Sequence, residues 1–347
     1  MIDSHWHMYI PAYSDGTDFR IMLDRVLQAQ GLSAVNLCCI PCYEALGPAQ
    51  NILGAIYKLH NPNAYAYGGL VYPQKPFRKP MPQGMDPLSQ YEELMAIGFD
   101  GIKMLETKPS EQKAYDVCID DAYFDDLFTA CERNSTHMVW HVADPEIFWD
   151  INRIPQRFLD KGWFYGDGTY MSYERIYGQV YNVLDKHPNL PVTFAHFFFL
   201  SAHPERLEQL FARYPRTSVD LTPGAEMHSD FRENYDYYRN FFIKYADRVF
   251  FGTDTSHKDW DMTRFVERSL TLQKFVTTDQ DLTVITTNTK GMALPEDVSR
   301  KILGDNFRAV AGDTPKPVNR RALKAYLEKY RHLISQPEML QYFDENI

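Results

Sequence analysis

Several features are scarce in this 347-residue chain, and each scarcity excludes a class of protein. No stretch approaches the roughly 20 apolar residues of a membrane-spanning helix, and no basic segment near the start leads into an apolar one. The five cysteines form an odd and sparse set, which is typical of reduced thiols. Positive charge is in deficit, and a net charge of −10 argues against a nucleic-acid-binding surface. We therefore expect an unprocessed cytoplasmic protein that binds neither membranes nor nucleic acids.

Repeats and linkers are also missing, which favours a single domain over residues 1–347. The chain has no internal repeat, no low-complexity tract and no Gly- or Ser-rich linker. Hydrophobic residues make up 44% of it, enough for a sizeable core. Apolar runs alternate with helical segments eight times, and parallel strands need such helices between them. The pattern predicts an α/β fold, a (β/α)8 TIM barrel over about residues 1–280, with extra C-terminal helices over about residues 281–347.

The expected strands are short apolar runs, and the expected helices are the longer segments between them. The runs predict strands at residues 2–7, 34–39, 64–71 and 101–105, a fifth ending at His141, a sixth ending at His196, a seventh at 217–221 and an eighth ending at Asp254. Helices are predicted at 19–30, 49–59, 123–133, 173–186, 204–214, 230–245, 263–275, 295–311 and 320–342, with one more ending at residue 97.

One connection in this pattern is unusual. Residues 142–171 are long for the loop between a strand and its helix, and they are rich in aromatic side chains. Such a loop is typical of a lid or pocket wall, but it also suits a small satellite core.

Polar side chains stand at the ends of several expected strands, where a parallel barrel builds its active site. His5 and His7 are one residue apart, so an extended chain points both imidazoles to the same face. His141, His196 and Asp254 each close another apolar run. Any one of them could be a hydrogen-bonded residue that caps its strand. Five such residues on at least four strands indicate instead a metal site, for which histidine is a common ligand.

With these strand ends in this order, the chain resembles the amidohydrolase superfamily, in particular its amidohydrolase-related branch, amidohydrolase-2. The likeness extends from Met1 to about Gly312 and includes further stretches: residues 186–190 leading to 194–196, residues 205–207, 214–215 and 219–221, residues 247–254 and residues 302–307. Residues 320–347 fall outside it.

The resemblance implies one divalent metal ion held by His5, His7, His141 and Asp254. His196 would lie beside the metal and orient water or polarise a substrate oxygen, while Asp254 would also accept a proton. Mixed histidine and aspartate ligands with an open position favour zinc, and manganese and iron are alternatives.

Lys103 and His257 are expected to meet the substrate. In binuclear relatives a lysine on strand four is carboxylated and bridges two metals, whereas in this branch an unmodified lysine more often accompanies a single metal. We expect the unmodified form, whose ammonium would pair with a substrate carboxylate or phosphate, or with an acidic side chain. His257 follows Asp254 by three residues on a loop at the same end of the barrel. His228 is a weaker candidate of the same kind.

These residues together predict a metal-dependent hydrolase, in which metal-activated water attacks an ester, lactone or amide carbonyl of a small polar substrate. The strongest alternative is a non-oxidative decarboxylase (a carboxy-lyase), because the resembled branch includes aminocarboxymuconate-semialdehyde and resorcylate decarboxylases. Ile10-Pro11 resembles their first loop. A hydratase comes third, and a non-catalytic binding scaffold is the least favoured reading. The expected partner is a small molecule, anionic if it pairs with Lys103, and the chain is compatible with a homo-oligomer.

Overall fold

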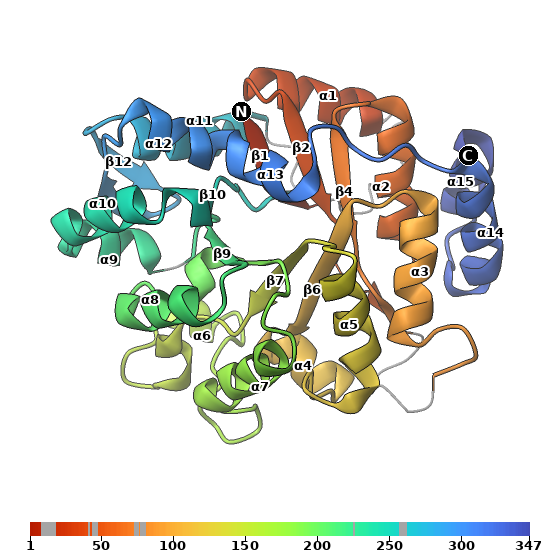
Figure 1. Ribbon diagram of the computed structural model, residues 1–347, viewed down its shortest axis with the longest axis horizontal. Helices are drawn as coiled ribbons and strands as arrows, with labels where there is room; N and C mark the ends of the chain where they lie inside the picture. Colours follow the sequence, from red (N-terminus) through yellow and green to blue (C-terminus); the bar gives the residue numbers. More distant parts are fainter. Residues whose placement is uncertain are drawn as a thin grey trace.

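A computed structural model shows parallel strands arranged as a barrel with helices around them (Figure 1). The structure describes residues 1–7, 19–40, 42–43, 48–72, 76, 81–224, 226–256 and 262–347. Within these residues, the main sheet consists of nine strands, β1 (Ile2–His7), β2 (Ala34–Cys38), β4 (Ala64–Gly68), β6 (Gly101–Thr107), β7 (Met138–Val142), β8 (Val192–Phe194), β9 (Thr217–Asp220), β10 (Val249–Phe250) and β11 (Thr255–Ser256). Their order is β10-β9-β8-β7-β6-β4-β2-β1-β11, and every pair is parallel.

The two shortest strands close the barrel between them. β10 pairs with β9, whereas β11 pairs with β1. The residues that connect β10 to β11 also bond to β1: Ser4 N donates to Phe251 O at 3.0 Å, and Asp254 N donates to His5 O at 3.0 Å. The left-handed conformation of Asp254, with φ 52°, interrupts the strand. β10 and β11 are therefore the two halves of the eighth barrel strand, and the predicted (β/α)8 fold is confirmed.

Helices cover the outside of this barrel (Figure 1). Among the described residues they are α1 (Phe19–Ala29), α2 (Ala49–His60), α3 (Pro87–Ile97), α4 (Pro109–Tyr115), α5 (Asp125–Arg133), α6 (Gln156–Leu159), α7 (Tyr173–Lys186), α8 (Pro204–Arg213), α9 (Met227–Glu233), α10 (Tyr235–Lys244), α11 (Met262–Thr277), α12 (Glu296–Arg300), α13 (Asn306–Ala311), α14 (Arg320–Tyr330) and α15 (Pro337–Asn346). The last two pack outside the barrel against α3 and α2. In the part of the chain that the structure describes, no helix is both long enough and apolar enough to cross a membrane.

Local signals explain why many helices begin and end where the sequence predicts. α7 begins after Ser172, whose hydroxyl accepts from Arg175 N, and it buries Ile176, Val180 and Val183 on one face. α3 begins after Asp86, whose side chain accepts from Ser89 N, and ends at a left-handed Gly98. Both segments therefore carry their own start signals, and α3 also carries its own stop signal.

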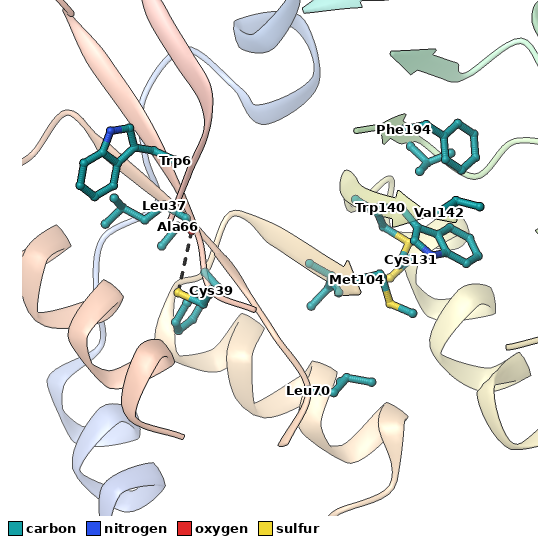
Figure 2. Packing of buried hydrophobic residues seen from close by; sticks show 14 of the residues in the cluster. Trp6, Leu37, Cys39, Ala66, Leu70, Met104, Cys131, Trp140, Val142 and Phe194 are labelled. Carbon is teal, nitrogen blue, oxygen red and sulfur yellow. Dashed lines mark hydrogen bonds between the residues drawn. The ribbon is translucent and has the colours of Figure 1, made fainter. Parts of the chain in front are cut away.

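The apolar faces of the strands pack against the helices and leave the other face for the site. Figure 2 shows Trp6, Leu37 and Ala66 on neighbouring strands, with Trp140 and Phe194 further round the barrel. All five side chains are buried. Because side chains alternate along a strand, Trp6 pointing outward places its neighbours His5 and His7 on the opposite, inner face.

Several elements differ from the sequence prediction. The expected C-terminal helices do not begin at residue 281, because β12 (Asp281–Val284) and β13 (Thr287–Lys290) form an antiparallel hairpin there. This stretch is rich in β-branched residues, which favour strands. The expected helix 320–342 is divided between α14 and α15 because Pro337 starts a new helix. Residues 230–245 likewise contain a break at Asn234, and β8 ends two residues before His196. Two further short strands, β3 (Cys42–Tyr43) and β5 (Val71–Tyr72), pair with each other.

Candidate metal centre

Three possible metal ligands converge at the carboxyl end of the barrel strands. His5 and His7 come from β1, and their Nε2 atoms are 3.1 Å apart. Asp254, at the break in the eighth strand, places Oδ1 3.1 Å from His7 Nε2 and 4.0 Å from His5 Nε2. One ligand atom from each of the three residues lies within 4.8 Å of the others. Two imidazole nitrogens and one carboxylate oxygen form a donor set that suits zinc.

The opposite ring nitrogens of the two histidines are held by acceptors. His7 Nδ1 lies 2.8 Å from Cys38 O, a carbonyl that can only accept, so Nδ1 carries the proton. His5 Nδ1 lies 2.7 Å from Asp220 Oδ2, which fixes the same tautomer. Both Nε2 atoms are then left with their lone pairs, as metal ligation requires.

This tautomer assignment provides a test of whether the residues fit a cation. His5 Nε2 and Asp254 Oδ1 each lie 3.1 Å from His7 Nε2. All three atoms are acceptors in this tautomer, and acceptors at that distance repel. A proton on one ring would relieve a single contact, whereas a divalent cation among the three atoms would relieve them all. The donor set therefore fits a metal ion.

Burial keeps the imidazoles of His5, His141 and His196 neutral. It lowers the pKa of His5 well below its usual range, and the Lys103 ammonium and the other rings lower it further. Burial likewise lowers the pKa of His196 and of His141 to about 4. Near neutral pH these three rings are therefore neutral.

Asp220 is a functional candidate that sequence reasoning missed. Besides holding His5, it accepts a hydrogen bond at 2.8 Å from the backbone N of His196. Its side chain is completely buried at the end of β9. The available signal was its place, because Asp220 stands at the end of the predicted strand 217–221. A sequence cannot show that its carboxylate faces His5 and not solvent.

Lys103 is completely buried beside His5. Its ammonium on β6 is buried, with Nζ 3.0 Å from His5 Nε2, and burial lowers its pKa. It thus contacts the same lone pair that a metal would use. One lone pair cannot serve both, so cation binding at His5 requires this contact to be released.

His196 and His141 lie side by side next to the three convergent residues. Their ring centroids are 4.8 Å apart, and the His196 ring is 5.9 Å from that of His5. His196 Nδ1 is buried without a hydrogen-bond partner among the described residues. His141 is not one of the three converging residues. Its Nε2 lies 2.9 Å from Ala143 O and 3.3 Å from Asp144 Oδ1, so Nε2 carries the proton. Its Nδ1 keeps the lone pair.

Of the predicted site, the structure thus brings His5, His7 and Asp254 together and places Lys103 and His196 beside them. The predicted roles of all these residues stay predictions. His257 and Ile10-Pro11 lie outside the described residues.

Comparison with known proteins identifies the family. The amidohydrolase family model matches residues 74–310, more than half of the chain, so the chain belongs to the amidohydrolase family. The match includes Lys103, His141, His196 and Asp254, and it starts after the paired histidines of β1. Members of this superfamily are generally metal-dependent, which agrees with the convergent donor set. No curated protein is significantly similar to the chain.

Three solved structures share the fold at low sequence identity. An uncharacterised TIM-barrel protein from Bordetella bronchiseptica has 16% identity and a TM-score of 0.51, with 90% of this chain and 100% of that one covered. A 2,6-dihydroxybenzoate decarboxylase has 14% identity and a TM-score of 0.51, with 89% and 98% covered. A 4-oxalomesaconate hydratase from Rhodopseudomonas palustris has 14% identity and a TM-score of 0.50, with 96% and 99% covered. At these identities, the likeness establishes the barrel fold.

Proposed function

We propose that this chain is a metal-dependent hydrolase that acts on a small anionic substrate. The observation that carries the proposal is the convergence of His5 Nε2, His7 Nε2 and Asp254 Oδ1, three atoms that can each ligate one shared cation. His5, His7 and Asp254 would hold the metal, and His141 would join them through Nδ1. When bound, a divalent cation would lower the pKa of a water molecule from about 15.7 towards about 7 and polarise a carbonyl group.

Asp254 and His196 would move the protons of the reaction. The Asp254 side chain is 35% exposed, so water can reach it, and an ionised aspartate can accept a proton. His196 is neutral, and its ring can donate a hydrogen bond to negative charge that develops on a substrate oxygen. The unpartnered Nδ1 of His196 supports this role, because buried polar atoms normally have a partner.

Lys103 would bind the anionic part of the substrate. Its contact with His5 is the interaction that cation binding must release, and the freed ammonium would be buried without that hydrogen-bond acceptor. A substrate carboxylate or phosphate would supply an acceptor with the opposite charge.

A carboxy-lyase is the second candidate, and the same buried ammonium favours it. A substrate carboxylate held by Lys103 would leave as carbon dioxide when its bond to the substrate breaks, and a proton from a site residue would take its place. Among the structures with this fold is a 2,6-dihydroxybenzoate decarboxylase. A hydratase is also represented among them.

Product analysis on metal-loaded protein separates these reactions. Esters, lactones, amides and aromatic carboxylic acids would be tested, with acid release and carbon dioxide release measured on each. We expect acid release without carbon dioxide, abolished in Asp254→Asn and retained in Asp281→Asn, which changes an exposed carboxylate elsewhere. Carbon dioxide release alone would establish the carboxy-lyase instead. Protein that takes up no divalent metal would refute both candidates.

A further inference from the structure

Asp144 lies just after β7 and joins three separate parts of the chain. Its carboxylate is buried, with Oδ1 3.3 Å from His141 Nε2. Both oxygens accept from Lys108 Nζ at 2.8 Å, and Oδ2 accepts from the Tyr165 hydroxyl at 2.8 Å. Burial opposes its charge, but Lys108 and His141 outweigh burial and hold the Asp144 pKa below its usual range. The proposed reaction does not use this residue.

The contacts of Asp144 determine which nitrogen of His141 can bind a metal. Nε2 faces two acceptors, Ala143 O and Asp144 Oδ1, so it carries the proton. Nδ1 is left with the lone pair. A carboxylate behind a histidine also fixes the orientation of the ring and makes it a stronger ligand.

Tyr165 belongs to a segment with its own small core. This aromatic segment, residues 146–171, buries Phe148, Ile154, Phe158 and Tyr165 against one another. It is also attached to α4, because Lys113 Nζ lies 3.9 Å from the Tyr170 ring centroid. The sequence suggested either a lid or a satellite core for this stretch, and the structure shows the satellite core. The Tyr165 hydroxyl donates out of that core to the Asp144 carboxylate, which lies behind His141.

We propose that Asp144 is a positioning residue that couples the aromatic segment to metal binding at His141. This inference rests on the proposed function, because it requires His141 to be a ligand. Tyr165 and Lys108 hold the Asp144 carboxylate in place, and Asp144 holds His141 with Nδ1 free. Removing the Tyr165 hydroxyl should therefore weaken metal binding although Tyr165 touches no ligand. By linkage, metal binding should stabilise the aromatic segment in return.

Zinc affinity, measured by competition with a chelator near neutral pH, tests the coupling. We expect Asp144→Asn to bind zinc about 10–100-fold more weakly, the usual effect of losing a partner behind a ligand. For Tyr165→Phe we expect a loss of about fivefold, at the low end of typical coupling between sites. If Asp144→Asn fails to fold, Tyr165→Phe keeps the test decisive.

Two matched variants control for stability. Asp100 is an equally buried carboxylate paired with Lys58 at the opposite end of the barrel. Tyr330 is an equally buried tyrosine whose hydroxyl donates to Glu93. Asp100→Asn and Tyr330→Phe should lower the melting temperature and leave zinc affinity unchanged.

Hydrogen exchange of residues 146–171 supplies a second readout. Zinc should slow exchange there in the wild-type protein and should not do so in Asp144→Asn. If wild-type protein binds no zinc, the proposed function itself fails. Suppose that wild-type protein binds zinc and that His141→Ala lowers the zinc affinity. If Asp144→Asn and Tyr165→Phe then behave like their controls, only the coupling is overturned. If His141→Ala binds zinc normally, the coupling is likewise overturned, while the site of His5, His7 and Asp254 stands.

Discussion

Replacing Asp220 by asparagine should reverse the tautomer of His5 and so impair metal binding. In the wild-type protein Asp220 Oδ2 accepts from His5 Nδ1 at 2.7 Å, and Oδ1 accepts from the backbone N of His196 at 2.8 Å and of Thr222 at 3.1 Å. An asparagine of the same shape would keep its one oxygen on the two backbone donors. Its amide nitrogen would then face His5 Nδ1 as a second donor, and the ring would have to move its proton to Nε2.

The magnitude follows from the contacts that are lost. With the proton on Nε2, His5 cannot ligate until it takes up the less favoured tautomer again. Outer partners of this kind are typically worth about 10–100-fold in metal affinity, which equals about 1.4–2.7 kcal/mol of binding free energy. The backbone partners of Oδ1 are retained, so the metal-free protein should lose only about 1–3 kcal/mol of unfolding free energy, the cost of one mismatched buried group.

Chelator competition gives the zinc dissociation constant, and thermal unfolding without metal gives the stability. Asp100→Asn, at the opposite end of the barrel, controls for the loss of a buried carboxylate. Wild-type zinc affinity in Asp220→Asn would show that Asp220 does not set the tautomer of His5. Equal loss of affinity in Asp100→Asn would mean that global stability, and not the ring proton, governs metal binding.

Three further predictions concern other histidines and the buried lysine. His196→Asn should retain most of the metal and lose about 10²-fold in kcat, a common loss for a general acid or base; full activity would leave His196 a structural role. Lys103→Ala should raise KM for an anionic substrate more than it lowers metal content, whereas loss of two metals per chain would indicate a carboxylated bridging lysine. His228 is buried against Phe231 and Phe275, neither ring nitrogen has a hydrogen-bond partner among the described residues, and burial lowers its pKa to about 3. Below about pH 6.5 the unfolded chain therefore binds a proton that the folded protein excludes, and His228 costs about 1.4 kcal/mol of stability per pH unit between about pH 6.5 and 3. His228→Leu should reduce this acid sensitivity in urea unfolding at a series of pH values, and an unchanged pH dependence would contradict the assignment.

The sequence by itself determined the barrel and the strand ends that carry the site. Strand and helix periods are local properties, so β1 and α7 occupy the predicted residues 2–7 and 173–186. The rule that active sites of parallel barrels lie at the carboxyl ends of strands then selected His5, His7 and Asp254. Their convergence agrees with that rule, because it depends on fold class and strand parity alone.

Only the tertiary structure decided which side chains face which. Asp220 is the last residue of β9, yet its position behind His5 depends on the register between β9 and the eighth strand. The same holds for Asp144, whose partners come from segments far apart in sequence. The hairpin β12–β13 was missed although its β-branched residues favour strands, whereas the break at Asp254 arises where the barrel closes and was not predicted. Periodicity specifies the direction of a side chain along its own strand, but hydrogen-bond partners, ring tautomers and burial arise only when distant strands are brought into contact.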